Sequence, residues 1–213
     1  MKMIIWLKRL IIRLPFWLPD FILYILQSII YLVHYRKWLG DHEHIEVPDR
    51  WDLFSMCNSS VINYYEFGVA SGHSFIWWVK NNGNKDSRFY GYDTFEGLPE
   101  RWGVYRRGTM ASNIPEIKDL RAFFVKGMFQ DTLSSLNVSP KIVHIDCDLY
   151  NSILFVLTTI NWQQGDIIIF DDFNVMAHGF RAFYDWTNST KIRYEIMAGT
   201  KYNSEIIIKI KGE

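Results

Sequence analysis

The sequence predicts an α/β fold with a mostly parallel sheet that ends in an antiparallel hairpin. From residue 61 onward, short apolar runs typical of buried strands alternate with segments of helical periodicity. This alternation is the pattern of a parallel sheet covered by helices. The last two strand-like runs, 192–199 and 204–211, are separated by a short turn and are therefore expected to pair antiparallel. The 213 residues suffice for one large domain and an N-terminal extension.

The expected elements follow one another without a repeat or a low-complexity tract. Strands are expected at 61–68, 87–93, 122–127, 141–148 and 165–173, ahead of the closing hairpin. Helices are expected at 72–82, 115–123, 150–161 and 177–189. Between 94 and 113, glycine and proline interrupt any regular pattern, so we expect an irregular loop there.

Composition and charge restrict the expected partners and compartment. The chain has 23 basic and 23 acidic residues and a formal net charge of zero. Because no basic excess is present to neutralise phosphates, nucleic acid is not expected as a partner. The two cysteines, Cys57 and Cys147, show no pairing pattern, which favours a reduced, cytoplasmic setting.

Residues 1–40 form an apolar and basic extension ahead of the domain expected at 41–213. No small-residue cleavage site follows the apolar run, so the segment is not typical of a signal peptide. Prolines and Asp20 interrupt it, which disfavours a membrane-spanning helix. A helix is expected to begin at Asp20. Its polar residues fall on one narrow stripe, made of Asp20, Tyr24, Gln27, Ser28, Tyr31 and Tyr35.

Two interpretations of this extension remain open. Basic residues lie among tryptophans ahead of the helix, at Lys2, Lys8, Arg9 and Arg13. Such a mixture suits the interface of an anionic membrane and would place the protein peripherally on the inner face. Alternatively, the apolar faces pack on the domain or on a second copy of the chain, which would give a homodimer.

The first strand-turn-helix, EFGVASGHS at 66–74, predicts a nucleoside site. Its two glycines, Gly68 and Gly72, bracket a turn where the backbone can approach a ligand closely. A dinucleotide-type glycine motif is absent, so a pyrophosphate is not expected. Glu66 suits a cation such as an amino group or a sulfonium, and Asp93 suits the ribose hydroxyls. The alternative is a glycine turn that serves geometry alone.

Two pairs of acids follow two strands of the expected sheet. They are Asp146 and Asp148 in one motif and Asp171 and Asp172 in the other. Adjacent parallel strands end at the same edge, so the four carboxylates are expected to gather there. Neither motif contains lysine or arginine, so a cation is required, and hard oxygen ligands favour Mg²⁺, with Mn²⁺ or Ca²⁺ as alternatives. The remaining alternative is a set of strand-end caps.

Five motifs, in this order, resemble the macrocin O-methyltransferase family. They are EFGVASG (66–72), DTFEGLP (93–99), KGMFQDTL (126–133), IDCDLY (145–150) and GDIIIFDD (165–172). The resemblance covers roughly residues 60 to 190. Members of this family are magnesium-dependent sugar O-methyltransferases of antibiotic pathways that use S-adenosylmethionine. Their Rossmann-like class I methyltransferase fold has seven strands with the last one antiparallel.

The resemblance implies roles for particular residues. It implies an S-adenosylmethionine pocket formed by Glu66, Gly68, Ser71, Gly72, Ser74, Asp93, Thr94, Phe95, Gly127, Phe129 and Asp131. It also implies Asp146, Asp171 and Asp172 as Mg²⁺ ligands and Asp148 as the general base. Beside a dication, Asp148 is expected to keep a low pKa. His178 and Tyr150 are candidates for contacts with the substrate.

The sequence also departs from the family, and these departures leave the acceptor open. The segment 99–117, where members build a lid, is short, and the N-terminal extension is unexpected for an antibiotic-pathway enzyme. A sugar, a polyketide glycoside and a lipid-linked saccharide all fit. A catechol-type O-methyltransferase usually carries a lysine shortly after its first metal aspartate, whereas Cys147 follows Asp146 here. A non-catalytic, membrane-tethered binding module of the same fold is the third alternative.

Overall fold

The computed structural model describes residues 20–58 and 61–212, apart from the side chain of Asp20. Within these ranges one mixed sheet is formed by β1 (Ile45–Val47), β2 (Asn63–Phe67), β3 (Arg88–Asp93), β4 (Ala122–Lys126), β5 (Ile142–Ile145), β6 (Ile167–Phe170), β7 (Tyr194–Thr200) and β8 (Ile206–Ile210). The strand order is β1-β7-β8-β6-β5-β2-β3-β4. Strand β8 is antiparallel to both of its neighbours, and the other adjacent pairs are parallel.

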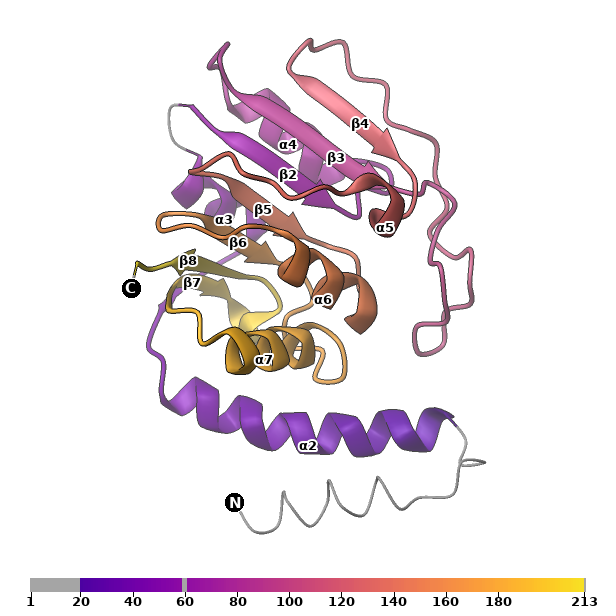
Figure 1. Ribbon diagram of the computed structural model, residues 1–213, viewed down its shortest axis with the longest axis vertical. Helices are drawn as coiled ribbons and strands as arrows, with labels where there is room; N and C mark the ends of the chain where they lie inside the picture. The colour runs from indigo at the N-terminus through magenta and orange to yellow at the C-terminus, as the bar shows by residue number, and fades with distance from the viewer. Residues whose placement is uncertain (1–19, 59–60, 213) are drawn as a thin grey trace.

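Helices cover both faces of this sheet (Figure 1). They are α2 (Asp20–Gly40), α3 (Arg50–Cys57), α4 (His73–Asn81), α5 (Phe129–Thr132), α6 (Tyr150–Thr159) and α7 (Gly179–Thr190), with a 3₁₀ turn, η1 (Lys201–Asn203). Side-chain alternation along β2 divides the core between the two faces. Tyr64 packs in the cluster under α3 and α4. Tyr65 and Phe67 pack on the opposite face with α6 and α7.

The predicted fold class is confirmed, because the seven strands other than β1 have the order and the single antiparallel strand of a class I methyltransferase sheet. Strand β1 and helix α3, which precede the first predicted strand, were not predicted. The three residues of β1 extend the sheet by pairing parallel with β7. Only one of them is even half-buried, so the segment lacks the apolar alternation by which a strand is recognised.

The helix predicted at 115–123 is wrong. The chain is irregular from 111 to 120 and then enters β4. The carboxylate of Asp119 accepts hydrogen bonds from the backbone N and the Nε of Arg121, at 2.9 and 3.0 Å. A local side-chain bond of this kind offers the backbone a turn in place of a helix.

Helix α2 begins at Asp20, as predicted, and packs against α7 through its polar stripe. The hydroxyl of Tyr31 donates to the Asp185 carboxylate at 2.9 Å, and Arg181 Nη1 donates to Gln27 Oε1 at 3.0 Å. Further along α2, Trp38 is buried against aromatic residues of the domain. The polar stripe therefore faces the protein, which reverses the usual polarity of a surface helix.

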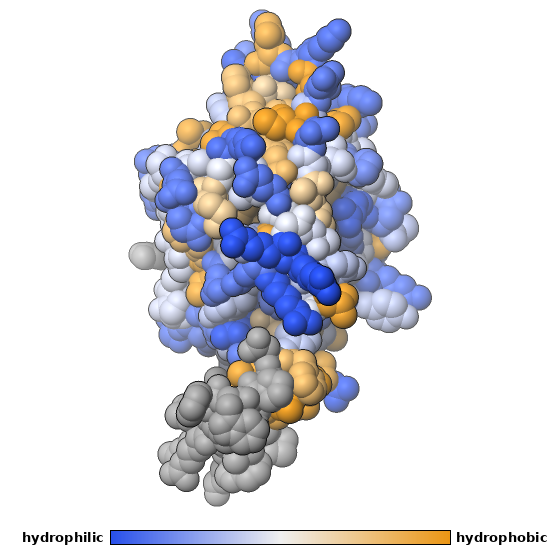
Figure 2. Space-filling view, turned by 90° about the vertical axis from the view of Figure 1, so that its right-hand side faces the viewer, coloured by the Kyte–Doolittle hydropathy of each residue, from blue (hydrophilic) through white to orange (hydrophobic). Residues whose placement is uncertain are grey.

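The opposite side of α2 is apolar and exposed. Phe21 is 64% exposed, Ile25 49% and Ile29 45%, and all three lie on one side at spacings of four. Hydrophobic side chains accordingly gather at the lower end of the face in Figure 2, where α2 lies. None of the helices in the described part of the chain has the length and apolarity needed to cross a membrane. The basic residues predicted to meet a membrane, from Lys2 to Arg13, lie outside the described residues.

Candidate active site

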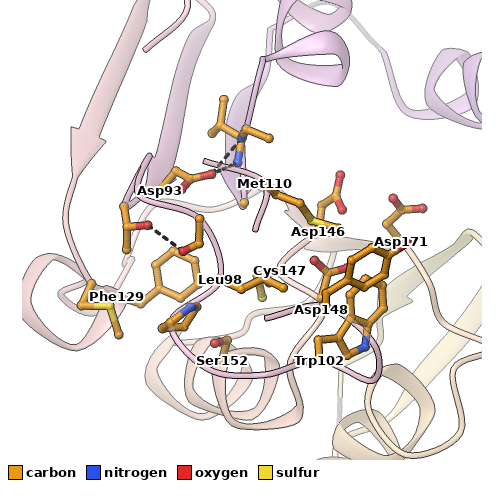
Figure 3. Close-up of a pocket in the computed structure, with 18 of the residues that line it drawn as sticks. Asp93, Leu98, Trp102, Met110, Phe129, Asp146, Cys147, Asp148, Ser152 and Asp171 are labelled. Carbon is orange, nitrogen blue, oxygen red and sulfur yellow. Dashed lines mark hydrogen bonds between the residues drawn. The ribbon is translucent and has the colours of Figure 1, made fainter. Parts of the chain in front are cut away.

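A cavity of about 380 Å³ lies at the carboxyl ends of β2, β3, β5 and β6. Figure 3 shows that the residues lining it divide between two ends. Asp93 and Phe129 lie at one end, and the acids Asp146 and Asp171 lie at the other. The side chain of Cys147 lies between them. The site thus has room for two groups side by side, one at each end.

The turn after β2 brings these two ends into direct backbone contact. Gly68 has a φ of +92°, and a Cβ at this position would lie 1.8 Å from the carbonyl oxygen of Asp146. The backbone N of Asp146 donates to the carbonyl of Phe67 at 2.9 Å. Glycine is therefore required at 68 both for its backbone conformation and for the space that it leaves.

Asp93 stabilises the same turn. Its Oδ2 accepts hydrogen bonds from the backbone N of Val69 and of Ala70, both at 2.8 Å, and its Oδ1 accepts from Phe95 N at 2.7 Å. An ionised carboxylate has about four acceptor sites, so capacity remains toward the cavity that Asp93 lines. A contact between Asp93 and ribose hydroxyls stays a prediction.

Glu66 lies outside the cavity, contrary to the prediction that it meets a cationic ligand group. Its carboxylate is fully buried on the α3 and α4 side of the sheet. It accepts hydrogen bonds from Tyr64 OH at 2.5 Å and from Ser74 Oγ at 2.6 Å. Glu66 shares a strand face with Tyr64 rather than with Phe67, and this face turns it into the core. Ser74 is turned inward with it.

Only part of the predicted cofactor set lines the cavity. Gly68, Asp93, Thr94 and Phe129 do so. The predicted residues that do not line it are Glu66, Ser71, Gly72, Ser74, Phe95, Gly127 and Asp131. The segment around Phe129 is nevertheless placed as expected, because Met128 and Gln130 also line the cavity.

The four predicted acids are brought together, since Asp146, Asp148, Asp171 and Asp172 all line the far end of the cavity. Burial, with the nearby charges of Asp171 and Glu66, raises the pKa of Asp146 well above its ordinary value. Burial and the carboxylates of Asp172 and Asp171 raise the pKa of Asp148 to about 7. Burial and Asp171 also raise the pKa of Asp172. The protein by itself thus gives Asp148 a raised pKa, and the low pKa expected beside a dication stays a prediction.

A cation from outside both acidic motifs approaches this cluster. Arg50, the first residue of α3, places Nη2 at 3.2 Å from Asp171 Oδ1 and at 2.7 Å from Glu205 Oε1. Burial alone would lower the pKa of Arg50, but Asp171 and Glu205 more than offset it, and the pKa is raised. Arg50 therefore supplies part of the positive charge that was predicted to come from a metal ion. Among the described residues, no group of three acid, histidine or cysteine side chains is arranged to hold a metal ion.

The predicted substrate residues, His178 and Tyr150, lie beside the cavity rather than in its lining. His178 Nδ1 accepts a hydrogen bond from the backbone N of Tyr150 at 3.1 Å. The His178 ring lies 6.4 Å from Trp102, which lines the cavity, and 5.8 Å from Tyr24 of α2. Burial, with a smaller effect of Arg181, lowers the pKa of His178 to about 4. Its neutral imidazole therefore supports the wall that Trp102 forms.

Replacing His178 with asparagine should reduce the loss of stability in acid. The folded pKa of His178 lies below the unfolded value of about 6.5, so its contribution is complete above pH 6.5 and is lost as the pH falls toward 4. After allowance for solvent screening of a half-buried group, this contribution amounts to about 1–2 kcal/mol. Free energies of unfolding by urea at pH 7.5 and 4.5 should therefore differ less in His178→Asn than in the natural protein.

The exposed His73 supplies the matched control, because His73→Asn should leave the difference between the two pH values as it is in the natural protein. An equal pH dependence in His178→Asn and the natural protein would contradict the expected role of His178 burial.

The loop between β3 and β4 forms the outer wall of the cavity, which the sequence did not specify. Leu98 N donates to the carbonyl of Thr109 at 2.8 Å, and Trp102 and Tyr105 exchange backbone hydrogen bonds. The Trp102 and Tyr105 rings stack with centroids 5.4 Å apart. Both rings line the cavity, together with Leu98 and Met110. Their aromatic content was the available signal, since irregular loops on a rigid sheet commonly carry binding residues.

The sheet order, the antiparallel β8 and a cavity at the carboxyl edge define a class I methyltransferase. The model of the macrocin-O-methyltransferase (TylF) family matches residues 110–200, which include both acidic motifs. This match confirms the family resemblance over those residues. The chain is an S-adenosylmethionine-dependent O-methyltransferase.

One solved structure supports this fold, and a second is reported beside it. The cofactor-bound protein Rv0187 from MTB has a TM-score of 0.51 and 14% identity, and the alignment covers 92% of this chain and 91% of that one. The O-methyltransferase from Bacillus cereus in complex with SAH has a TM-score of 0.48 and 13% identity, with 87% and 90% covered. At such identities the likeness concerns the fold alone. No curated protein matches the sequence.

Proposed function

We propose that the protein transfers a methyl group from S-adenosylmethionine to a hydroxyl of a saccharide or glycoside, with Mg²⁺ at the acid cluster. One observation carries the proposal: four carboxylates line the end of the cavity opposite Asp93 and Phe129. A methyl donor at one end and an acceptor held among acids at the other would place the two reacting groups side by side.

The donor end fits a nucleoside. The Gly68 turn lets the backbone approach a ligand, Asp93 presents a carboxylate, and Phe129 presents an aromatic ring. Bound there, S-adenosylmethionine would supply an electrophilic methyl group, whose bond to sulfur would break as its bond to the acceptor oxygen forms. Cys147, between the two ends, would border the path of this transfer.

Asp148 would take the proton of the acceptor hydroxyl. Asp148 lines the acceptor end of the cavity, where this proton would be released. Without a metal ion the pKa of Asp148 is about 7, and Mg²⁺ bound among the neighbouring acids would lower it, so the ion would supply much of the activation of the hydroxyl. Asp148 also has a φ of 59°, in the left-handed region that few residues other than glycine adopt. Such a conformation directly after a strand is consistent with a functional side chain held in a fixed direction.

The acid cluster fits Mg²⁺ by its donor chemistry. Asp146, Asp171 and Asp172 offer hard oxygen ligands. Burial first, and then the charges of neighbouring carboxylates, raise the pKa values of Asp146 and Asp172, although Arg50 lies beside Asp171. When bound, Mg²⁺ makes the proton of a coordinated hydroxyl easier to remove. Arg50 would share Asp171 with the ion.

The acceptor end favours a saccharide through its combination of acids and aromatic rings. Stacked Trp102 and Tyr105 offer a flat surface for the C–H face of a sugar ring, and the acids can accept hydrogen bonds from its hydroxyls. A catechol would also stack on these rings. The shape of the cavity therefore does not distinguish a saccharide from a catechol, and measured turnover must do so.

The test is methyl transfer by the full chain to methyl glycosides of glucose, galactose and rhamnose, with catechol as the comparison acceptor. Glycosides should be methylated, EDTA should abolish the activity, and Mg²⁺ should restore it. Full activity after EDTA treatment would remove the metal from the proposal, and methylation of catechol alone would favour the catechol-type alternative. Failure to bind S-adenosylmethionine in calorimetry would leave only the non-catalytic module.

The exposed apolar side of α2 supports the proposed setting, a peripheral position on the inner face of an anionic membrane. Flotation of the chain with phosphatidylglycerol vesicles, but not with phosphatidylcholine vesicles, would agree with this position.

A homodimer through the same surface stays a prediction, and sedimentation would detect it. The division into 1–40 and 41–213 also stays a prediction, although α2 packs closely on α7.

A further inference from the structure

The wall of the acceptor end continues outward as an apolar surface. Trp102 lines the cavity, and its ring meets His178, which in turn meets Tyr24 of α2. Tyr24 lies one helical turn from Phe21, which is 64% exposed. Val104, two residues after Trp102 in the same loop, is 83% exposed. A series of neighbouring rings thus leads from the cavity lining to the first turn of α2, where the exposed Phe21 lies.

Two features indicate that this surface meets an amphiphile. Helix α2 buries hydrogen-bonding side chains such as Tyr31 against α7 and leaves its apolar side unoccupied among the described residues. The loop tip combines exposed apolar and basic residues, since Val104 lies near the exposed Arg106 and Arg107. This combination is complementary to a molecule that carries both an apolar chain and negative charge, or to an anionic membrane that contains it.

We propose that the acceptor is an amphiphilic glycoside, whose sugar enters the cavity past Trp102 while its apolar chain lies against Val104 and Phe21. This inference rests on the proposed function and names the class of its substrate. Each methylene group removed from water strengthens binding, so a chain that is only partly covered by this surface improves binding by at least about tenfold.

The experiment compares octyl β-glycosides with methyl β-glycosides of the same sugars, below the micellar concentration of the octyl compounds. The ratio of their kcat/KM values should be at least ten for the natural chain. In the double variant Val104→Ser/Phe21→Ser this ratio should fall to about three or less. Both positions are exposed, so the replacements remove the apolar contact without opening the core.

Leu39→Ser is the matched control, because Leu39 is an exposed apolar residue at the opposite end of the same helix, at 40% exposure. The ratio should remain at least ten in this variant. An octyl glycoside that is no better than its methyl counterpart would overturn the inference, and so would a ratio that the double variant retains.

Failure of the proposed function has a different signature, because neither glycoside of any pair would then be methylated. In that case, calorimetric titration of the chain loaded with S-adenosylhomocysteine decides the inference separately. Octyl β-glucoside should bind at least tenfold more tightly than methyl β-glucoside, and equal binding would overturn the inference.

Discussion

Replacing Asp148 with asparagine is expected to lower kcat for methyl transfer by about 10²- to 10⁴-fold, the usual contribution of a general base. Asparagine has nearly the same shape and tolerates the left-handed backbone found at this position, where φ is 59°. The loss should therefore come from chemistry and not from the fold. Single-turnover kinetics with the best glycoside acceptor measure it, and calorimetry should show binding of S-adenosylmethionine unchanged within about threefold.

Glu96→Gln provides the matched control for Asp148→Asn. Glu96 lies on the loop that borders the cavity, but its side chain is 77% exposed and pairs with Lys126. This neutralised carboxylate should leave kcat within about twofold of the natural value. If Asp148→Asn retains its rate as Glu96→Gln does, Asp148 is not the base.

The second large expected effect is a loss of stability. It concerns an ion pair at the amino ends of β5 and β6, opposite the edge that carries the cavity. Lys141 and Asp166 form an ion pair with both side chains fully buried, and Asp166 also accepts hydrogen bonds from Ser139 Oγ and Gln163 N at 2.8 Å. Removing one partner of a buried pair leaves an uncompensated charge, at a cost of about 3–5 kcal/mol. Asp166→Ala should lower the free energy of unfolding in urea by this amount, a large part of the ~5–15 kcal/mol typical of a domain.

An exposed ion pair supplies the control for this prediction. Lys211 and Glu195 are paired with side chains 44% and 42% exposed, so Glu195→Ala should cost no more than about 1 kcal/mol. Replacing both buried partners by apolar residues, in Lys141→Met/Asp166→Leu, should recover part of the loss, because no unpaired charge remains. An Asp166→Ala variant as stable as Glu195→Ala would show that the buried pair has no such role.

The sheet and the acid cluster could be predicted from sequence because both depend on short-range patterns. Apolar strands alternate with helices, and acids directly after β5 and β6 must meet at one edge, where Asp146 and Asp171 are found. Strand β1 could not be predicted, since its three residues are recognisable only by their pairing with β7. Arg50 was missed for a related reason, because it reaches Asp171 from 121 residues away in the sequence.

The orientation of Glu66 could not be predicted for a different reason. A carboxylate at the end of the first strand is compatible with a ligand contact and with a buried position, and the strand face decides between them. The deciding contacts come from Tyr64 on the same strand, from Ser74 in α4 and from His144 on β5. Only the folded arrangement places these groups around Glu66, so the motif alone did not reveal its orientation.

The absent side chain at Gly68 limits how the selectivity of this enzyme can be changed. Its backbone lies directly against the carbonyl of Asp146, so the turn at Gly68 and the segment at Asp146 cannot shift independently. An engineered variant that shifts this turn to admit a bulkier sulfonium reagent would displace Asp146 as well. Preference for the alkyl donor and preference for the hydroxyl compound should therefore change together, and libraries that vary one should be screened for both.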